Sequence, residues 1–444
     1  MAAISHARKA AFEILLAVER GRAHSDDLLR GKQVSELLAP DRHLTTALVL
    51  GVLRSQIALD EQIRALLSRP NARLDTEIQI ALRLGAFQLL HMDRVPAHAA
   101  IDESVELAKH AGHGHASRMV NAVLRKIAVA PRSKAPAVFD AEHAYPGWMV
   151  ERWNRAYGIA GTQDICAWGQ AEPASLIRLA DASAEEELRQ QGIVIEPGQL
   201  LRAARAVASG DVTATAAFRE GRVRFQDEGS QLVAEIAAFK AGERVLDACA
   251  APGGKTLILA ERNQQAKIVA CEASAQRLAH LQQRLASLGE RVEYRLGDAA
   301  EIADRAAYDL VLADVPCSGT GTLGRNPEIR HRLRLENLPR QAERQVAILH
   351  AAISAVRPGG RVVYSTCSLE QEENEQVIEA VLAEQSNVRV DPIRDRLAAM
   401  ESEGILIAGA GKELAACLTP EGYLRLMPGA FGTDGFFIAL LAWD

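Results

Sequence analysis

The chain has 444 residues, a formal net charge of −6, 48% hydrophobic residues and 24% charged residues. This length predicts two or three domains, each long enough to bury its own core. No apolar run reaches the roughly 18 residues of a membrane span, and the N-terminus lacks the apolar region and cleavage site of a secretory signal. We therefore expect a cytoplasmic protein with no membrane partner.

The six cysteines argue for free thiols. They are too few for a disulfide framework in a chain of this length, and they lack the paired C-x2-C spacing of zinc sites. We expect all of them to be reduced, and we expect no metal site. The cysteines stand at positions 166, 249, 271, 317, 367 and 417.

Charge is unevenly distributed along the chain. Residues 1–140 carry a formal charge of +4, and the remaining residues carry −10. A polyanionic partner would therefore have to be bound by local patches. On charge alone, the one obvious basic patch is better explained as a solvated helix face. It contains Arg325, Arg330, Arg332, Arg334, Arg340 and Arg344 against three glutamates.

The first 140 residues predict an all-α bundle. Apolar residues recur at i, i+3, i+4 and i+7, and proline and glycine separate the periodic segments. No catalytic set is evident there, and the histidines fit structural or surface roles. The predicted helices cover residues 7–21, about 49–69, 76–92, 99–112 and 116–129.

A proline-rich break near residues 130–146 leads into a mixed segment, which we interpret as a small α+β module. It combines a helix near residue 150 with strands at 175–180, 192–196 and 221–226. From about residue 236, apolar strands alternate with helical segments up to the fifth strand, and a sixth strand ends the chain. This alternation predicts a parallel, doubly wound α/β sheet of the Rossmann-like kind.

Ligands bind such sheets at the carboxyl ends of the strands. The loop "DACAAPGGKT" follows the first strand, but the first glycine of a P-loop would fall on Cys249, and G-x-G-x-x-G is absent. Glu272 ends the second strand and suits a ribose diol, whereas Asp298 ends the third and suits an adenine amino group. This set fits S-adenosylmethionine as the cofactor.

Two further strands lead into loops that contain cysteine, at Cys317 and Cys367. A strand-end cysteine is often an inert buried thiol, but two at one ligand-binding edge suggest covalent catalysis. Carbon 5 of cytosine becomes nucleophilic when a thiolate adds to carbon 6, and a second group must later remove the carbon 5 proton. Residue chemistry alone leaves open which cysteine attacks, although the proline before Cys317 slightly favours Cys317 as the nucleophile.

The motifs "DACAAPGGKT", "LADVPCSGTGTLGRNPEIR", "YSTCSLEQEENE" and "GTDGFFIALL" resemble those of the RNA cytosine-C5 methyltransferases of the Nol1/Nop2/Sun family. The stretches "LRLGAFQLLHMDRVPAHAAIDESVELAKH" and "RMVNAVLRKIA" resemble the NusB-like domain that precedes the methyltransferase domain in bacterial members. The middle segment resembles the small RNA-recognition-like subdomain of the family. Where relatives commonly have Arg-x-Asn, however, this chain has Arg178, Leu179 and Ala180.

The resemblance implies a role for each matching residue. Cys367 would be the nucleophile, and Cys317 would promote release of the methylated product. Asp314 would lie between the cofactor and the base, and Lys255 would contact the base or cap a carbonyl. The cofactor would be bound by Cys249, Ala250, Ala251, Pro252, Gly253, Gly254, Lys255, Glu272, Arg277, Asp298 and Asp314.

The resulting prediction is a monomeric enzyme that methylates carbon 5 of a loop cytosine in small-subunit (16S) ribosomal RNA. Its arginine patch would then contact phosphates. The predicted domains are a NusB-like RNA-binding bundle at 1–139, the α+β module at 140–235 and the methyltransferase domain at 236–444. Transfer RNA is an alternative substrate, and a non-catalytic RNA-binding antitermination-type factor is the alternative from another class.

Overall fold

The computed structural model describes residues 4–71, 73–129, 141–237 and 242–444. The chain forms two compact units. The first, the helical unit, comprises residues 1–172 together with 323–332. The second, the sheet unit, comprises residues 173–322 together with 333–444.

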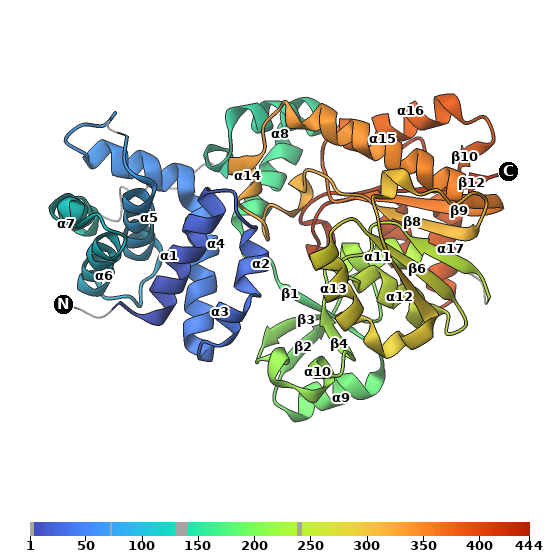
Figure 1. Ribbon diagram of the computed structural model, residues 1–444, viewed down its shortest axis with the longest axis horizontal. Helices are drawn as coiled ribbons and strands as arrows, with labels where there is room; N and C mark the ends of the chain where they lie inside the picture. The colour runs from blue at the N-terminus through green and yellow to red at the C-terminus, as the bar shows by residue number, and fades with distance from the viewer. Residues whose placement is uncertain (1–3, 72, 130–140, 238–241) are drawn as a thin grey trace. The chain divides into compact units, whose positions relative to one another are not determined.

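The helical unit is all α, as predicted (Figure 1). Apolar side chains at helical spacing on α1, α4, α5, α6 and α7 converge on one buried cluster. Gly51 and Gly85 permit close helix packing, because a Cβ at either glycine would come within 2.5 Å of a neighbouring side chain. The helices are α1 (His6–Glu19), α2 (Ser25–Leu29), α3 (Lys32–Ser35), α4 (Ala39–Leu66), α5 (Thr76–His91), α6 (Ala97–His110), α7 (Ser117–Val129), α8 (Gly147–Gln170) and α14 (Ile329–Arg332).

The segment 323–332 departs from the sequence prediction. Arg330 was expected in a phosphate-contacting patch, but it is fully buried in the helical unit. Its guanidinium lies 4.1 Å from the centre of the Tyr145 ring and donates a hydrogen bond of 2.9 Å to the Gly169 carbonyl. The prediction is therefore wrong for Arg330, because a residue buried in this way cannot reach a phosphate. Arg334, Arg340 and Arg344 are exposed.

The predicted domain boundaries also differ from the observed units. The boundary at 139/140 lies outside the described residues, and helix α8 belongs to the helical unit rather than to a middle module. The end of α8 is bonded to the rest of this unit, since Gln170 donates to the Arg54 carbonyl of α4 at 3.4 Å and the Gly169 carbonyl accepts from Arg330 at 2.9 Å. The boundary at 235/236 falls inside helix α11 (Glu228–Ile236).

The sheet unit begins with a four-stranded antiparallel sheet in the order β2-β3-β1-β4. Three of its strands were predicted, and β3 was missed because its alternation of arginine and alanine is only weakly apolar. The strands are β1 (Ser175–Leu179), β2 (Val194–Pro197), β3 (Ala204–Ser209) and β4 (Val223–Phe225), and they pack with α9 (Ala182–Gln190) and α10 (Ala216–Arg219).

A buried charge network joins this small sheet to the helices beside it. Arg178 on β1 is 3% exposed, and its guanidinium lies 2.8 Å from a Glu235 carboxylate oxygen and 3.0 Å from Glu261. Arg178 therefore has a structural role here.

Replacing Arg178 with alanine is expected to lower the free energy of unfolding by about 3 kcal/mol, since removing one partner leaves buried charge unpaired. Chemical denaturation measures this loss. Arg189→Ala on α9 is the matched control: its exposed pair with Glu185 should contribute under roughly 0.5 kcal/mol. Equal effects of the two substitutions would contradict the structural role of Arg178.

The large sheet has eight strands among the described residues, in the order β10-β12-β9-β8-β5-β6-β7, with β11 paired to β12. Strands β5 to β9 are parallel, as predicted, but β12 runs antiparallel to β9, so the sheet is mixed. The segment between β9 and β12 contains two short strands as well as helices, so it is not a single helical crossover of the kind that joins parallel strands. The strands are β5 (Arg244–Asp247), β6 (Lys267–Glu272), β7 (Val292–Leu296), β8 (Tyr308–Asp314), β9 (Val356–Thr366), β10 (Val388–Val390), β11 (Leu424–Leu426) and β12 (Phe436–Trp443).

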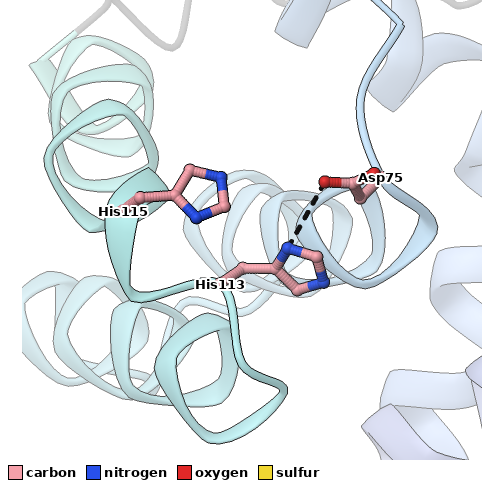
Figure 2. Close-up of side chains that lie close together, drawn as sticks. All are labelled: Asp75, His113 and His115. Carbon is pink, nitrogen blue, oxygen red and sulfur yellow. Dashed lines mark ion pairs between the residues drawn. The ribbon is translucent and has the colours of Figure 1, made fainter.

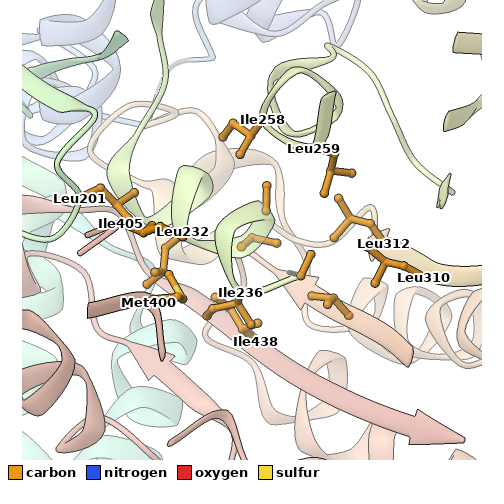
Figure 3. Packing of buried hydrophobic residues seen from close by; sticks show 14 of the residues in the cluster. Leu201, Leu232, Ile236, Ile258, Leu259, Leu310, Leu312, Met400, Ile405 and Ile438 are labelled. Atoms are coloured by element: carbon orange, nitrogen blue, oxygen red, sulfur yellow. The ribbon is translucent and has the colours of Figure 1, made fainter. Parts of the chain in front are cut away.

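Helices cover both faces of this sheet (Figure 1). On β8, Leu310 and Leu312 face one cluster and Val311 and Ala313 face the other, as the period of two requires. Figure 3 shows the first cluster, in which Leu232 and Ile236 of α11 pack near Ile438. The flanking helices are α11, α12 (Gly254–Arg262), α13 (Ala275–Arg284) and α17 (Ile393–Ser402) on one face, and α15 (Asn337–Ala355) and α16 (Glu375–Glu384) on the other.

A short helix α18 (Ala410–Ala415) completes the sheet unit. Within the described ranges, no helix combines the length and apolar character that crossing a membrane requires.

Candidate active site

Strands β8 and β9 are parallel neighbours, so their carboxyl ends meet at one edge of the sheet. Asp314, the last residue of β8, lies in register with Ser365 of β9. The two cysteine-bearing loops leave the sheet immediately beyond these residues. Parallel pairing thus brings together residues that are about 50 positions apart in the sequence.

The sulfurs of Cys317 and Cys367 lie 3.4 Å apart. This is a thiol contact, because the sulfurs of a disulfide are about 2.0 Å apart, and both cysteines are free and half-buried. Gly321 permits the approach: its N–H donates to the Cys367 carbonyl at 2.8 Å, and its carbonyl accepts from Gly435 at 2.8 Å. A Cβ at position 321 would lie 2.4 Å from the Gly435 oxygen, so only glycine fits.

The two thiols have different surroundings. The hydrogen bond with Cys367, burial and the negative charge of Glu373 together raise the pKa of Cys317 well above its usual value. Cys317 therefore holds its proton at neutral pH. The Lys255 ammonium, in contrast, interacts electrostatically with Cys367.

Lys255 and Asp314 form an ion pair beside the thiols. The Lys255 Nζ atom lies 2.7 Å from Asp314 Oδ2 and donates to Ser230 Oγ at 3.0 Å. Ser365 Oγ donates to the other oxygen, Asp314 Oδ1, at 2.7 Å. Burial is the largest influence and lowers the pKa of Lys255, but the charge and hydrogen bond of Asp314, together with Cys367 and Asp247, raise this pKa overall. Lysine is thus held as a cation and the aspartate is fixed in orientation.

The residues predicted to bind the cofactor line the neighbouring strand ends. Glu272 ends β6 and is buried, with one oxygen accepting from Ser274 N at 2.9 Å and the other 3.5 Å from Arg277. Arg277 also donates to the Ala251 carbonyl at 3.0 Å, which ties the 249–255 loop to β6. Asp298 caps the turn after β7 and lies 3.4 Å from Arg344.

The 249–255 loop leads directly into helix α12, which begins at Gly254. Gly253 has a φ of 99°, and a Cβ there would lie 2.7 Å from Leu281, so this turn requires glycine. The loop brings the N–H groups at the start of α12 to the same edge as the three carboxylates Glu272, Asp298 and Asp314.

These carboxylates and N–H groups fit S-adenosylmethionine. Carboxylates at successive strand ends suit ribose hydroxyls, an amino group and a positive sulfonium centre, and the helix start suits a carboxylate. The fold and this site together define an S-adenosylmethionine-dependent, Rossmann-like methyltransferase.

Comparison with known proteins identifies the family. Residues 234–442 match the family described as 16S rRNA methyltransferase RsmB/F, and residues 5–129 match the NusB family. The chain is 32% identical to the "Probable ribosomal RNA small subunit methyltransferase B" of Bacillus subtilis (strain 168), over 97% of each chain. It is 33% identical to ribosomal RNA small subunit methyltransferase B of Xanthomonas campestris pv. campestris, over 98% of this chain and 96% of the relative. The chain therefore belongs to the RsmB/F family.

Solved structures agree with this fold. The crystal structure of PH0851 matches with a TM-score of 0.80 and 25% identity, over 99% of each chain. NSun6 from Pyrococcus horikoshii, solved with SFG, an S-adenosylmethionine analogue, matches with a TM-score of 0.57 and 20% identity, over 69% of this chain and 99% of that one.

Sequence reasoning missed the polar residues that support the cysteines and the lysine. Ser230, Gln345, Ser365 and Glu373 all hydrogen-bond to the elements described above. Glu373 lies within the quoted motif "YSTCSLEQEENE", and its place six residues after Cys367 is the one available signal. A single sequence does not distinguish it from its neighbours Glu372 and Glu375.

Proposed function

We propose that this chain methylates carbon 5 of a cytosine in small-subunit ribosomal RNA through a covalent enzyme–RNA adduct. The observation that carries the proposal is the pair of cysteine sulfurs 3.4 Å apart at the carboxyl edge of a methyltransferase sheet. Methylation of an exocyclic nitrogen or a ribose hydroxyl has no need of a thiol nucleophile, whereas carbon 5 of cytosine must be activated by addition to carbon 6.

In this proposal Cys367 is the nucleophile. Its thiolate adds to carbon 6 of the cytosine, which makes carbon 5 nucleophilic. S-adenosylmethionine, when bound, supplies the methyl group on a positively charged sulfur. Cys317, once it has lost its own proton, takes the proton from carbon 5, and the electron pair of that C–H bond expels the Cys367 thiolate as the carbon 6–sulfur bond breaks.

Lys255 and Asp314 would act as a unit in this scheme. The Lys255 ammonium forms an ion pair with Asp314 and interacts electrostatically with Cys367. Because Lys255 and Ser365 fix the Asp314 carboxylate, its remaining lone pairs can accept a hydrogen bond from the amino group of the cytosine or of the cofactor. Glu272, Arg277, Asp298 and the 249–255 loop would hold the cofactor.

Relatives named ribosomal RNA small subunit methyltransferase B support the substrate, since they match this chain over nearly its whole length. Bisulfite sequencing of total RNA with and without the gene tests the assignment. We expect one cytosine in the small-subunit RNA to lose its protection when the gene is removed. Loss at a transfer RNA site would favour the alternative substrate, and no change in any RNA would contradict the enzymatic assignment.

A further inference from the structure

Glu373 lies where the two cysteine-bearing loops meet. It belongs to the turn η8 (Gln371–Glu373), and its side chain is fully buried. A buried carboxylate is costly unless several donors satisfy it. The donors that satisfy Glu373 come from both loops and from helix α15.

One carboxylate oxygen of Glu373 accepts from the Ser318 N–H at 2.9 Å and from Gln345 Nε2 at 3.1 Å. The other accepts from the hydroxyls of Ser318 and Ser368, the latter at 2.5 Å. Ser318 directly follows Cys317, and Ser368 directly follows Cys367. One side chain is therefore hydrogen-bonded to both residues that follow the cysteines.

Gln345 reinforces this connection from helix α15. Its amide nitrogen donates both to Glu373 and to the carbonyl of Pro316, at 2.9 Å. The Tyr364 hydroxyl donates to the Glu373 carbonyl at 2.6 Å, which holds the backbone of the turn. The carboxylate has little freedom to move.

We propose that Glu373 is a positioning residue that ties the two cysteine-bearing loops together and sets the separation of their sulfurs. The inference rests on the proposed cytosine chemistry. The negative charge of Glu373 has a second effect: it opposes formation of a thiolate on Cys317. The other titratable groups that interact with Cys317 are Cys367 and Tyr364, both from β9 and its loop, and the backbone of Gly319 also hydrogen-bonds to Cys317.

Two substitutions distinguish the effect of the length of the Glu373 side chain from the effect of its charge. Glu373→Asp keeps the charge but is one methylene shorter, so it cannot span both loops. We expect adduct formation with RNA containing 5-fluorocytosine to slow roughly 10- to 100-fold. Glu373→Gln keeps the reach and removes the charge, so product release should reach half its maximal rate at a lower pH than in the wild type. The matched control is Glu379→Gln, which changes an exposed glutamate on helix α16.

These experiments distinguish failure of the positioning role of Glu373 from failure of the proposed cytosine chemistry. A wild-type chain that forms no adduct would contradict the cytosine chemistry itself. A normal wild-type adduct with unchanged rates in Glu373→Asp and an unchanged pH profile in Glu373→Gln would contradict the positioning role. A purely structural role would lower rates without moving the pH profile.

A second, independent cluster lies in the helical unit. Asp75, His113 and His115 each offer one ligand atom, and these atoms lie within 4.8 Å of one another. Asp75 caps helix α5, and the two histidines flank Gly114 at the turn that precedes α7. Figure 2 shows the two imidazole rings and the carboxylate turned toward a common space.

The surroundings of His113 match those of a metal ligand. Its Nδ1 atom lies 3.3 Å from Asp75, and its Nε2 atom lies 3.6 Å from the Glu77 carboxylate. Metal-bound imidazoles commonly direct the second nitrogen at a carboxylate, which fixes the ring. We infer that Asp75, His113 and His115 form a surface site for a divalent transition-metal ion of the zinc type, with open positions for water.

Titration calorimetry with Zn²⁺ tests this site in the full chain carrying Cys317→Ala and Cys367→Ala, which removes the competing thiol pair. We expect binding of one ion, weakened roughly tenfold or more by His115→Ala. The control is His110→Ala, at the exposed end of helix α6. Absence of zinc binding, or equal affinity in the His115→Ala chain, would overturn the assignment.

Discussion

Replacement of Cys367 by alanine is expected to reduce methyl transfer to RNA by roughly 10³-fold or more, because carbon 5 cannot be activated without addition at carbon 6. The fold should survive, since Cys367 is half-buried and its contacts with Gly321 run through the backbone. The measurement is transfer of a radioactive methyl group from S-adenosylmethionine to small-subunit RNA under single-turnover conditions.

Cofactor binding provides the internal control for this variant. Calorimetry should show S-adenosylmethionine binding to Cys367→Ala with wild-type affinity, because the predicted cofactor residues are Glu272, Asp298 and the 249–255 loop. Cys417→Ala, in the turn after α18, should retain full activity. Undiminished turnover in Cys367→Ala would contradict the nucleophile assignment.

The second large effect is expected at Cys317, and it differs in kind. Cys317→Ala should still form the bond between Cys367 and carbon 6, since the attacking sulfur is intact. Without the thiol that removes the carbon 5 proton, the adduct should persist after methyl transfer. A denaturing gel would then show a protein band shifted by the mass of the RNA, which the wild type does not accumulate.

The pH dependence of release follows from the same residue. Because Cys367, burial and Glu373 raise the pKa of Cys317, this thiol is protonated at neutral pH and loses its proton only as the pH rises. Release from the wild type should therefore accelerate with increasing pH. Clean and rapid release from Cys317→Ala, with an unchanged pH profile, would contradict its role.

Much of the fold follows from local patterns. Helical periodicity predicted the all-α bundle, and runs of Val, Ile and Leu predicted six strands of the large sheet, all of which are present. The exceptions depend on tertiary contacts. Strand β3 is only weakly apolar, and it forms because β1 and β2 lie on either side of it. Helix α8 joins the helical unit through hydrogen bonds of Gly169 and Gln170 with Arg330 and Arg54, which are far away in the sequence.

The site residues at the strand ends could be predicted, because reactive side chains there mark the edge of the sheet. The hydrogen-bonding partners that come from other elements could not be predicted. Asp314, Cys317 and Cys367 could be predicted to lie together because parallel strands share one edge. The partners Ser230 and Gln345 come from helices, and no spacing rule connects them to Lys255 or Pro316. For Arg330 the sequence predicted a functional role that the structure contradicts, since a charge count cannot reveal that an arginine is buried against tyrosine.

The most direct test of the proposed mechanism is the identity of the cysteine bonded to RNA. Small-subunit RNA containing 5-fluorocytosine should trap the enzyme, because fluorine on carbon 5 cannot leave as a proton does. Digestion and mass spectrometry of the trapped complex should then identify a nucleotide on the peptide containing Cys367. A nucleotide on the Cys317 peptide, or no covalent complex at all, would contradict the account.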